Sequence, residues 1–266
     1  DTYADYVLKG MEGVEVVGVA EPIRERREYM KNHHHLRDEF LFESWEQLLA
    51  IDKFCDAVLI CTNDDMHYEP AKLALEKGYH ILLEKPMTNT LEEVDKLENL
   101  AINYPNQVFM VCHVLRYTPF FSTIKRLIDE GAIGKIASIQ HNENIGYYHM
   151  AHSFVRGNWR NSVETSPIIL AKSCHDFDIL NFLVGAKCIK IASFGNLQHF
   201  KKECMPLKAS SRCIDCLIES DCPYSALKLY PQNIGKWPTS VITENQTEEG
   251  VKEALAHGPY GRCVYC

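Results

Sequence analysis

The chain has 266 residues, of which 46% are hydrophobic and 24% charged, the composition of a globular protein with enough apolar side chains for a core. Its formal net charge of −8 argues against a nucleic acid or an anionic membrane as the main partner. No apolar run approaches the roughly 20 residues that span a bilayer, and the first residues, DTYADYVLKG, lack the features of a signal peptide. Eleven cysteines, an odd number, fit a reducing compartment better than a disulfide framework. We therefore expect a cytoplasmic protein of one large domain or two.

Apolar strands and amphipathic helices alternate over the first 115 residues. In chain order we predict a helix ending at 3–10, a strand at 14–22, helices at 23–34 and 45–51, a strand at 56–63, a helix at 68–78, a strand at 80–86, a helix at 89–105 and a strand at 107–114. Nearly continuous apolar strands separated by helices indicate a parallel sheet that is covered on both faces.

The pattern changes near residue 115. We predict helices at 119–131 and 166–185, and strands of alternating apolar and polar residues at 134–147 and 187–200. Such alternation indicates a sheet with one wet face, hence an antiparallel or open sheet. Residues from about 200 to 266 are rich in cysteine and proline and have weak periodicity, so they are predicted to form an insertion or long loop. The predicted domains are 1–115 and 116–266.

An acid follows the first predicted strand. Ligands of open α/β sheets bind at the carboxyl ends of the strands, and Glu21 lies where dinucleotide-binding folds hydrogen-bond the adenosine ribose. An exposed loop acid would give the same pattern. Arg24 and Arg27 lie close by, and a guanidinium there would accept the 2′-phosphate of NADP.

Lys85 lies at the mouth of the predicted strand 80–86, between an acid and a proline. Because proline fixes the backbone, the amine can be directed into a pocket, where it would bind a substrate hydroxyl or have a lowered pKa. A surface lysine that merely follows a strand is the simpler interpretation of these residues alone.

The segment AKSCHDFD begins an otherwise apolar helix. Lys172 and His175 are three residues apart and therefore share a helix face. A histidine suits a general base, because its ordinary pKa is near 6.5. A partly buried histidine that pairs with Asp178 would give the same sequence.

Three segments together resemble one known family. Residues 57–93, AVLICTNDDMHYEPAKLALEKGYHILLEKPMTNTLEE, resemble the glucose–fructose oxidoreductase, inositol dehydrogenase and rhizopine-catabolism (Gfo/Idh/MocA) family in the order and spacing of their T-N-x-x-x-H and E-K-P motifs. VCHVLRYTPFF and KSCHDFDIL resemble its next strand and the helix that carries its catalytic histidine. The resemblance covers about residues 1–200. It implies a Rossmann-type doubly wound parallel sheet, followed by an α+β domain with an open, mostly antiparallel sheet.

The resemblance also implies an activity, the NAD(P)-dependent oxidation of a ring hydroxyl of a sugar, sugar derivative or cyclitol, with NAD favoured over NADP. Lys85 would hold and polarise the hydroxyl and His175 would remove its proton, with Lys172 beside them. The implied cofactor-binding residues are Glu21, Arg24, Thr62, Asn63, His67, Glu84, Lys85 and His113. The implied substrate-binding residues are Arg116, Trp159, Arg160 and Lys172.

The sequence departs from the family pattern at two places. Many members have an acid four residues before the histidine, where this chain has Ala171 followed by Lys172. The family's first strand and G-x-G-x-x-G turn are also missing, so we expect poor dinucleotide binding and a fragment of a competent enzyme. A degenerate, non-catalytic relative is one alternative. The other is a redox-assisted NAD-dependent glycosidase, since relatives of this family include such enzymes.

The cysteine-rich segment has the spacing of a metal site. Cys213-x2-Cys216-x5-Cys222 is accompanied by Cys204 upstream and by Cys263-x2-Cys266 downstream. We predict a structural zinc site formed by Cys213, Cys216, Cys222 and Cys263. Free thiols, adventitious disulfides and an iron–sulfur cluster are the alternatives. An open sheet in the second domain would further favour a homo-oligomer, because its exposed edge or face packs against another subunit.

Overall fold

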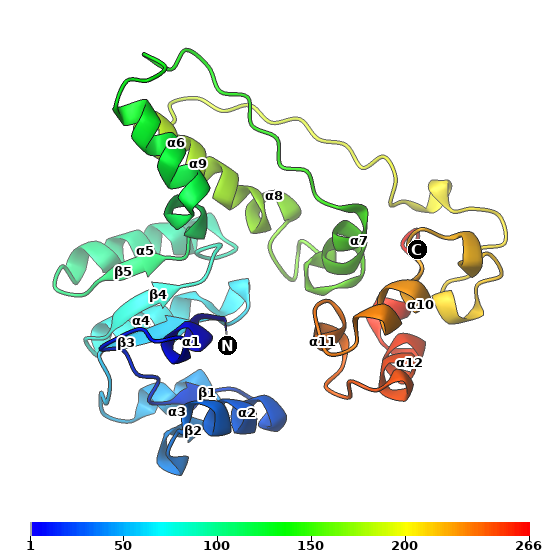
Figure 1. Ribbon diagram of the computed structural model, residues 1–266, viewed down its shortest axis with the longest axis horizontal. Coiled ribbons are helices and arrows are strands. Elements are labelled where there is room, and N and C mark those ends of the chain that lie inside the picture. Colours follow the sequence, from blue (N-terminus) through cyan, green and yellow to red (C-terminus); the bar gives the residue numbers. More distant parts are fainter. Residues whose placement is uncertain (1) are drawn as a thin grey trace. The chain divides into compact units, whose positions relative to one another are not determined.

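The computed structural model describes residues 2–266, which divide between residues 112 and 113 into two compact units (Figure 1). Unit 1 ends at Cys112, and unit 2 runs from His113 to Cys266. Among the residues described, no helix is both long and apolar enough to cross a membrane.

Unit 1 alternates parallel strands with helices, as the sequence predicts. Its elements are α1 (Thr2–Leu8), β1 (Val19–Ala20), α2 (Arg24–His34), η1 (Asp38–Phe40), β2 (Leu41–Phe42), α3 (Trp45–Ala50), β3 (Ala57–Ile60), η2 (Asp64–Met66), α4 (Tyr68–Glu76), β4 (His80–Leu83), α5 (Leu91–Asn103) and β5 (Phe109–Val111). β1 pairs with β2, and β4 pairs with both β3 and β5; every pairing is parallel. The predicted doubly wound parallel arrangement is confirmed.

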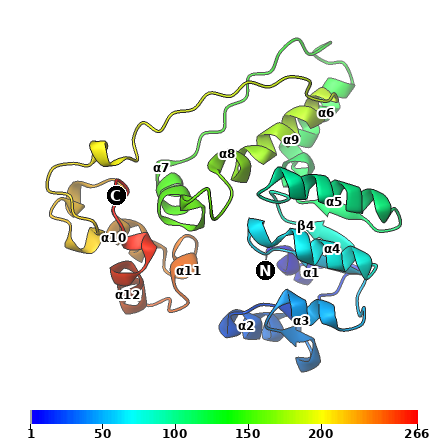
Figure 2. The same cartoon turned by 180° about the vertical axis from the view of Figure 1, so that it is seen from behind.

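The core of unit 1 lies between the second ladder and its helices. α4 and α5 pack side by side, and α4 also packs on β4 (Figures 1 and 2). Thr90 is the N-cap of α5: its hydroxyl accepts a hydrogen bond from the backbone N–H of Glu93 at 3.3 Å, which fixes the first turn. The fully buried apolar side chains of this core are Ala71, Ala74, Leu75, Tyr79, Leu83 and Leu97.

The strands of unit 1 form two separate ladders. In the doubly wound strand order 3-2-1-4-5-6, β2 and β1 correspond to the third and second strands, and β3 begins the second half. No strand among residues 2–112 occupies the position between β1 and β3. The predicted cover on both faces of the sheet is incomplete at β3, where Leu59 is 49% exposed. Among residues 2–112 this strand pairs with β4 alone.

Unit 2 is built from helices and turns. Its helices are α6 (Pro119–Asp129), α7 (Tyr147–His149), the π-helix η4 (Met150–Arg156), α8 (Ile168–Ala171), α9 (Ser173–Val184), α10 (Ala226–Leu229), α11 (Thr239–Ile242) and α12 (Glu248–His257). Its 3-10 turns are η3 (Val114–Tyr117), η5 (Asn158–Arg160), η6 (Lys202–Cys204), η7 (Cys213–Asp215), η8 (Glu219–Asp221), η9 (Pro231–Asn233) and η10 (Pro259–Gly261). α6 packs against α9.

The two strands predicted in unit 2 are not paired. Residues 134–147 and 187–200 are drawn as long ribbons without arrows in Figure 1, and the described residues of unit 2 contain one isolated antiparallel bridge, between Arg212 and Arg262. The prediction of ladders over these ranges is therefore wrong for the described structure. A strand forms only against a neighbour, and side chains such as Ile189 and Phe194 are almost fully exposed.

The prediction of a long loop over 200–266 is also wrong. This segment contains α10, α11 and α12, and it has a core of its own. Val251 and Leu255 are four residues apart on the same face of α12, and both are buried. The other buried members of this core are Cys213, Ala226, Tyr230 and Tyr260. Because these elements are short, their periodicity is weak in the sequence.

This core is tested by truncation. Leu255→Ala is expected to lower the free energy of unfolding by about 2–5 kcal/mol, because Leu255 is fully buried and its loss leaves a cavity. Leu207→Ala serves as the control, since Leu207 is 92% exposed and its truncation should cost less than about 0.5 kcal/mol. Urea unfolding followed by circular dichroism measures both. Equal, small losses would contradict a packed core in this segment.

Candidate active site

The middle strand of the second ladder delivers Lys85. Leu83 ends β4, where its carbonyl accepts a hydrogen bond from the N–H of Cys112 at 2.8 Å, and the N–H of Glu84 donates to the carbonyl of Ile60 at 2.9 Å. Lys85 is the next residue and is half-buried. It therefore lies at the carboxyl end of the sheet, where open α/β sheets bind their ligands.

The carboxylate of Glu84 is held by hydrogen bonds. Oε1 accepts from the hydroxyl of Tyr3 in α1 at 2.6 Å, and Oε2 accepts from the backbone N–H of Lys85 at 3.0 Å. Burial, together with hydrogen bonds to Cys112 and Glu84, raises the pKa of Tyr3, so the hydroxyl keeps its proton at neutral pH. Glu84 thus connects α1 to the end of β4 and fixes the backbone that carries Lys85.

His67 joins the loops that follow β3 and β4. Its ring is buried, with Nδ1 at 2.9 Å from the carbonyl oxygen of Pro86 and Nε2 at 3.0 Å from that of Thr62. Nδ1 also lies 3.2 Å from the carbonyl oxygen of Met87. Since main-chain oxygens face both ring nitrogens, this geometry favours a positioning role for His67 over direct contact with a cofactor.

Thr62 and Asn63 lie in the loop that His67 fastens. The hydroxyl of Thr62 donates to the carbonyl of Met66 at 3.2 Å, and the carbonyl of Asn63 accepts from the N–H of Met66 at 2.8 Å. Asn63 is exposed and Thr62 is half-buried. The structure therefore brings Thr62, Asn63 and His67 together with Glu84 and Lys85 at the carboxyl ends of two adjacent strands.

Glu21 and Arg24 lie at the carboxyl end of β1, in the other ladder of unit 1. Oε1 of Glu21 accepts from the N–H of Ile23 at 2.8 Å, at the entry to α2. The guanidinium of Arg27 donates to the carbonyl of Glu21, and its Nη2 lies 3.2 Å from Glu43 Oε1. Arg27 is thus committed to local contacts, whereas Arg24 is exposed on the first turn of α2.

In unit 2, His175 lies in α9 and faces His113. The two rings are 6.0 Å apart between centroids and meet edge to face. Asp178, one turn along α9, accepts hydrogen bonds from Nε of Arg116 at 2.7 Å and also from Nη2. Nε2 of His113 lies 4.0 Å from the same carboxylate. A bidentate ion pair therefore clamps η3 to α9 beside His175.

This clamp changes the interpretation of two residues. The hydrogen bonds with Asp178 raise the pKa of Arg116, and the guanidinium also lies over the ring of Phe182 at 5.1 Å. Arg116 was expected to approach the substrate, and its two bonds to Asp178 favour a positioning role. Asp178 was considered as a partner of His175, and the structure shows its carboxylate bound to Arg116. His141 makes a second contact with α9, since its Nε2 lies 2.7 Å from Asp176 Oδ1.

Lys172 interrupts the helix predicted over 166–185, because it lies between α8 and α9. Burial and the charge of Lys172 lower the pKa of His149, a residue of α7 that the sequence did not single out. The ring of His149 lies 5.2 Å from Trp237. In the sequence, the run Tyr147-Tyr148-His149 is the one sign of this site that could have been noticed. It lies directly before the π-helix η4, and π-helices are frequent at functional sites.

Trp159 and Arg160 belong to η5. The ring of Trp159 lies 6.0 Å from that of Phe154. Nη1 of Arg160 donates to the carbonyl of Gly157 at 3.2 Å, and Nη2 lies 4.0 Å from Glu164. Their assignment to a sugar pocket therefore stays a prediction, while the structure shows how local contacts hold both side chains.

His152 lies in a buried aromatic cluster formed by η4 and the C-terminal segment. Its Nδ1 is 3.0 Å from the hydroxyl of Tyr230, and its ring is stacked on Tyr260 with centroids 5.0 Å apart. Burial, with smaller contributions from His149 and Arg156, lowers its pKa to about 4. The ring is therefore neutral in the folded protein at pH 7.

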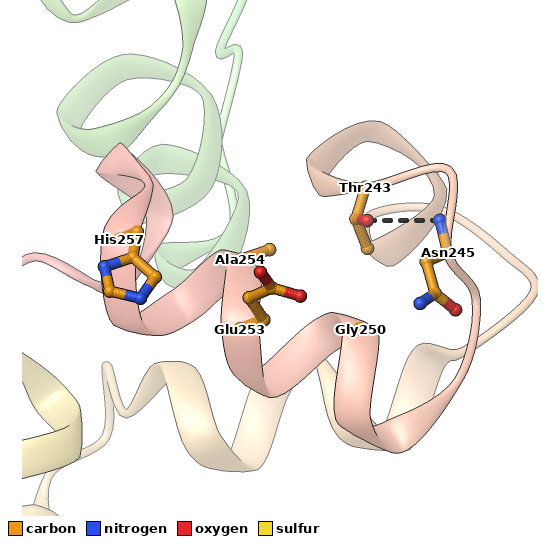
Figure 3. A pocket seen from close by; sticks show the side chains of 6 residues that line it. All are labelled: Thr243, Asn245, Gly250, Glu253, Ala254 and His257. Carbon is orange, nitrogen blue, oxygen red and sulfur yellow. Dashed lines mark hydrogen bonds between the residues drawn. The ribbon is translucent and has the colours of Figure 1, made fainter.

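One cavity of unit 2 is lined by none of the predicted site residues. It has a volume of about 280 Å³, lies beside α12 and is lined by Thr243, Asn245, Gly250, Glu253, Ala254 and His257 (Figure 3). A second cavity of about 30 Å³ is lined in part by Cys213, Cys216, Cys222 and Cys263. Within residues 2–266, however, no three histidine, cysteine, aspartate or glutamate side chains are grouped so that they could hold a metal ion. The zinc prediction is thus not confirmed by this arrangement.

Two models of one family match the chain. Residues 1–113 match GFO_IDH_MocA, described as an oxidoreductase family with an NAD-binding Rossmann fold, and residues 125–251 match the C-terminal alpha/beta domain of the same family. These matches confirm the predicted Rossmann-type domain, followed by a second domain that belongs to a family of domains built from both helices and strands.

Three known proteins illustrate the similarity. The scyllo-inositol 2-dehydrogenase (NAD(+)) of Bacillus subtilis is 27% identical over 202 residues, 73% of this chain and 54% of that protein. The 2,7-anhydro-N-acetylneuraminate hydratase of Mediterraneibacter gnavus is 24% identical over 196 residues, 73% of this chain and 49% of that protein. The scyllo-inositol dehydrogenase of Lactobacillus casei, solved with NAD(H) and scyllo-inositol, has a TM-score of 0.58 at 21% identity over 69% of this chain and 52% of its own, which shows the fold alone. The chain thus spans about half the length of these relatives.

The low pKa of His152 predicts a pH-dependent stability. The pKa is about 4 in the folded protein and 6.5 as its ordinary value, so the unfolded chain binds the proton more tightly. The contribution of His152 to the free energy of unfolding should therefore be present above its ordinary pKa of 6.5 and be lost as the pH drops from 6.5 toward 4. Urea unfolding at a series of pH values measures this dependence. His152→Gln should flatten the curve in that window, and an unchanged slope in the variant would rule out His152 as its source.

Proposed function

The chain belongs to the Gfo/Idh/MocA oxidoreductase family, and on that premise we propose that it oxidises a ring hydroxyl of a sugar or cyclitol with NAD(P) as hydride acceptor. The observation that carries the proposal is the position of Glu84-Lys85-Pro86 at the carboxyl end of β4, the middle strand of the ladder, in a chain that matches both domains of the family. The relatives named as inositol dehydrogenases support a polyol substrate.

Lys85 and His175 divide the proton chemistry in this proposal. The ammonium group of Lys85 donates a hydrogen bond to the reacting hydroxyl and stabilises the negative charge that develops on its oxygen. His175 accepts the hydroxyl proton while the carbon loses hydride, so that the alcohol becomes a carbonyl. NAD(P)⁺, when bound, supplies the acceptor for that hydride. Lys172 adds a positive charge three residues before the base and directly follows Ala171, the position where many relatives have an acid.

The described residues fit part of a dinucleotide. Glu21 at the end of β1 suits the hydroxyls of the adenosine ribose, and the loops at Thr62 and Lys85 suit the nicotinamide half. These 266 residues contain no G-x-G-x-x-G turn, so they do not supply the backbone contact to the pyrophosphate that this motif provides. We therefore expect the 266-residue chain to bind NAD weakly.

NAD is favoured over NADP in this proposal because of the carboxylate at the ribose position. Glu21 would accept a hydrogen bond from the 2′-hydroxyl of NAD and would repel the 2′-phosphate of NADP. Arg27, which could otherwise attract that phosphate, is engaged by Glu43 and by the carbonyl of Glu21. Arg24, which is exposed, is the residue that acts in the opposite sense.

A second function is favoured by one relative. The hydratase of Mediterraneibacter gnavus acts, by its name, on an anhydro sugar, and it aligns over 73% of this chain. On the same site, a transient oxidation would acidify the neighbouring C–H bond and allow a glycosidic substituent to be eliminated. The reduced cofactor would then return the hydride, so the reaction would release a leaving group without net NADH.

The proposal is tested with variants of both proton-transfer residues. In the presence of scyllo-inositol and NAD⁺ or NADP⁺, Lys85→Ala and His175→Ala should each lower kcat by at least about a hundredfold, the usual contribution of acid–base groups. Lys72→Ala and His257→Ala, which remove a helix-surface lysine and an exposed histidine, should leave kcat unchanged. The rate of NADH absorbance change measures the dehydrogenase reaction.

A parallel assay separates the functions. Release of the aryl group from an aryl glycoside without net NADH would support oxidation and elimination instead of dehydrogenation. Full turnover in either Lys85→Ala or His175→Ala would remove that residue from the mechanism. If the nicotinamide fluorescence does not change at any protein concentration, the chain does not bind the cofactor. A non-catalytic relative would then be the remaining interpretation.

A further inference from the structure

The cavity of about 30 Å³ in unit 2 brings together four cysteines that are distant in sequence. We propose that Cys213, Cys216, Cys222 and Cys263 bind one Zn²⁺ ion as thiolates and that this ion cross-links the C-terminal segment, independently of any catalytic reaction. A cavity needs roughly 10–15 Å³ of accessible volume to hold one water molecule, so this one has room for a single small ion. The rest of its lining is mostly apolar and includes Ile218, Val264 and Tyr265.

Backbone pairing, and not spacing alone, brings the distant fourth cysteine to the first. Arg212 and Arg262 form an antiparallel bridge, and the N–H of Cys263 donates to the carbonyl of Ser211 at 2.8 Å. Each bridged arginine immediately precedes a cysteine, so Cys213 and Cys263 leave the bridge side by side. The fold therefore fixes a contact between residues 50 positions apart before any ligand is considered.

Two turns place the other two cysteines. Cys216 follows η7, and its N–H donates to the carbonyl of Cys213 at 3.2 Å. Cys222 follows η8, and its N–H donates to the carbonyl of Glu219 at 3.1 Å. A short turn of this kind keeps the two cysteines of a C-x2-C motif on the same side of the turn, so that both thiolates can bind one ion.

The structure also selects four of the six cysteines in this segment. Cys204 does not line the cavity, and its thiol donates to the carbonyl of Gln198 at 3.3 Å. Cys266 is exposed and does not line the cavity either. Four thiolates are the number that a structural zinc site takes, without an open position for water.

Arg156 gives an independent reason to expect negative charge in this cavity. Its side chain is 2% exposed and lines the cavity, where Nη2 donates to the sulfur of Cys213 at 3.4 Å. Two further acceptors of its guanidinium are neutral, the carbonyls of Arg262 at 2.7 Å and Tyr224 at 2.8 Å. Nη1 is buried and makes no hydrogen bond. A buried guanidinium without an ion-paired carboxylate is costly to fold.

A zinc tetrathiolate would provide the missing counter-charge. Two positive charges on the ion and four negative charges on sulfur leave a net charge of about −2 beside the guanidinium. Glu219 also lines the cavity, and its Oε1 accepts a hydrogen bond from the hydroxyl of Ser225. Binding replaces four S–H bonds by four Zn–S bonds and releases four protons to water, so neither oxidation nor reduction is involved.

The thiols must rotate to close on an ion, because the side chains as described are not grouped around one point. A cysteine has a single side-chain torsion with three staggered positions, so each sulfur can turn into the cavity while its backbone stays in place. Closure to Zn–S distances of about 2.3 Å would join the core that contains Cys213 to the cluster that packs against Cys263. The ion would thus connect two small hydrophobic cores that do not share buried residues.

Metal analysis of the 266-residue chain, purified without chelator, tests the proposal. About one zinc per chain is expected after free metal is removed, and Co²⁺ substitution should give the intense thiolate-to-cobalt absorption of a tetrahedral site. Cys213→Ser and Cys263→Ser should each abolish stoichiometric binding. Cys204→Ser, the matched control in the same segment, should keep it.

Three other results would contradict the zinc site. Less than about 0.3 zinc per wild-type chain would overturn the site, as would bound iron with visible absorption or a disulfide between two of the four cysteines. Because Cys→Ser variants can fail to fold, the wild-type chain provides a second readout. A chelator should lower its melting temperature, whereas a melting temperature that does not respond to chelator would contradict a structural ion.

Discussion

The parallel pairing of β3, β4 and β5 is the constraint on which the candidate active site depends. Because all three strands run in the same direction, their polar carboxyl ends meet at one edge, and β4 between its neighbours delivers Glu84 and Lys85 to the middle of that edge. His67 then fastens the loop after β3 to the loop after β4 through carbonyl oxygens on both sides of its ring. The backbone around Lys85 is thereby held by the hydrogen bonds of Glu84 and His67.

Unit 2 uses charge pairing for the same purpose. The bidentate bonds from Arg116 to Asp178 hold η3 on α9, so that His113 and His175 face each other. Breaking one partner of such a pair leaves the other charge poorly solvated, which makes the clamp a rigid support. In both units the residues that sequence motifs single out as ligands, His67 and Arg116, instead have the contacts of supports for their neighbours.

The sequence predicts well what depends on local pattern. The helices and strands of unit 1 follow from apolar periodicity, and the position of Lys85 follows from the strand that precedes it. The sequence predicts poorly the features that depend on contacts between residues distant along the chain. The strands expected at 134–147 and 187–200 have the correct alternation but no described neighbour, and the core around Leu255 comes from short elements whose periodicity is weak. The partner of Asp178 is also invisible in the sequence, because Arg116 lies 62 residues away.

In the proposed mechanism, Lys85 and His175 act on the same substrate oxygen. The most direct measurement is a crystal structure of the protein with NAD⁺ and scyllo-inositol. The mechanism requires that Nζ of Lys85 and one ring nitrogen of His175 both lie within about 3.2 Å of one hydroxyl oxygen, whose carbon faces the nicotinamide. A bound substrate whose reacting hydroxyl contacts neither residue, or contacts them through different oxygens, would contradict it.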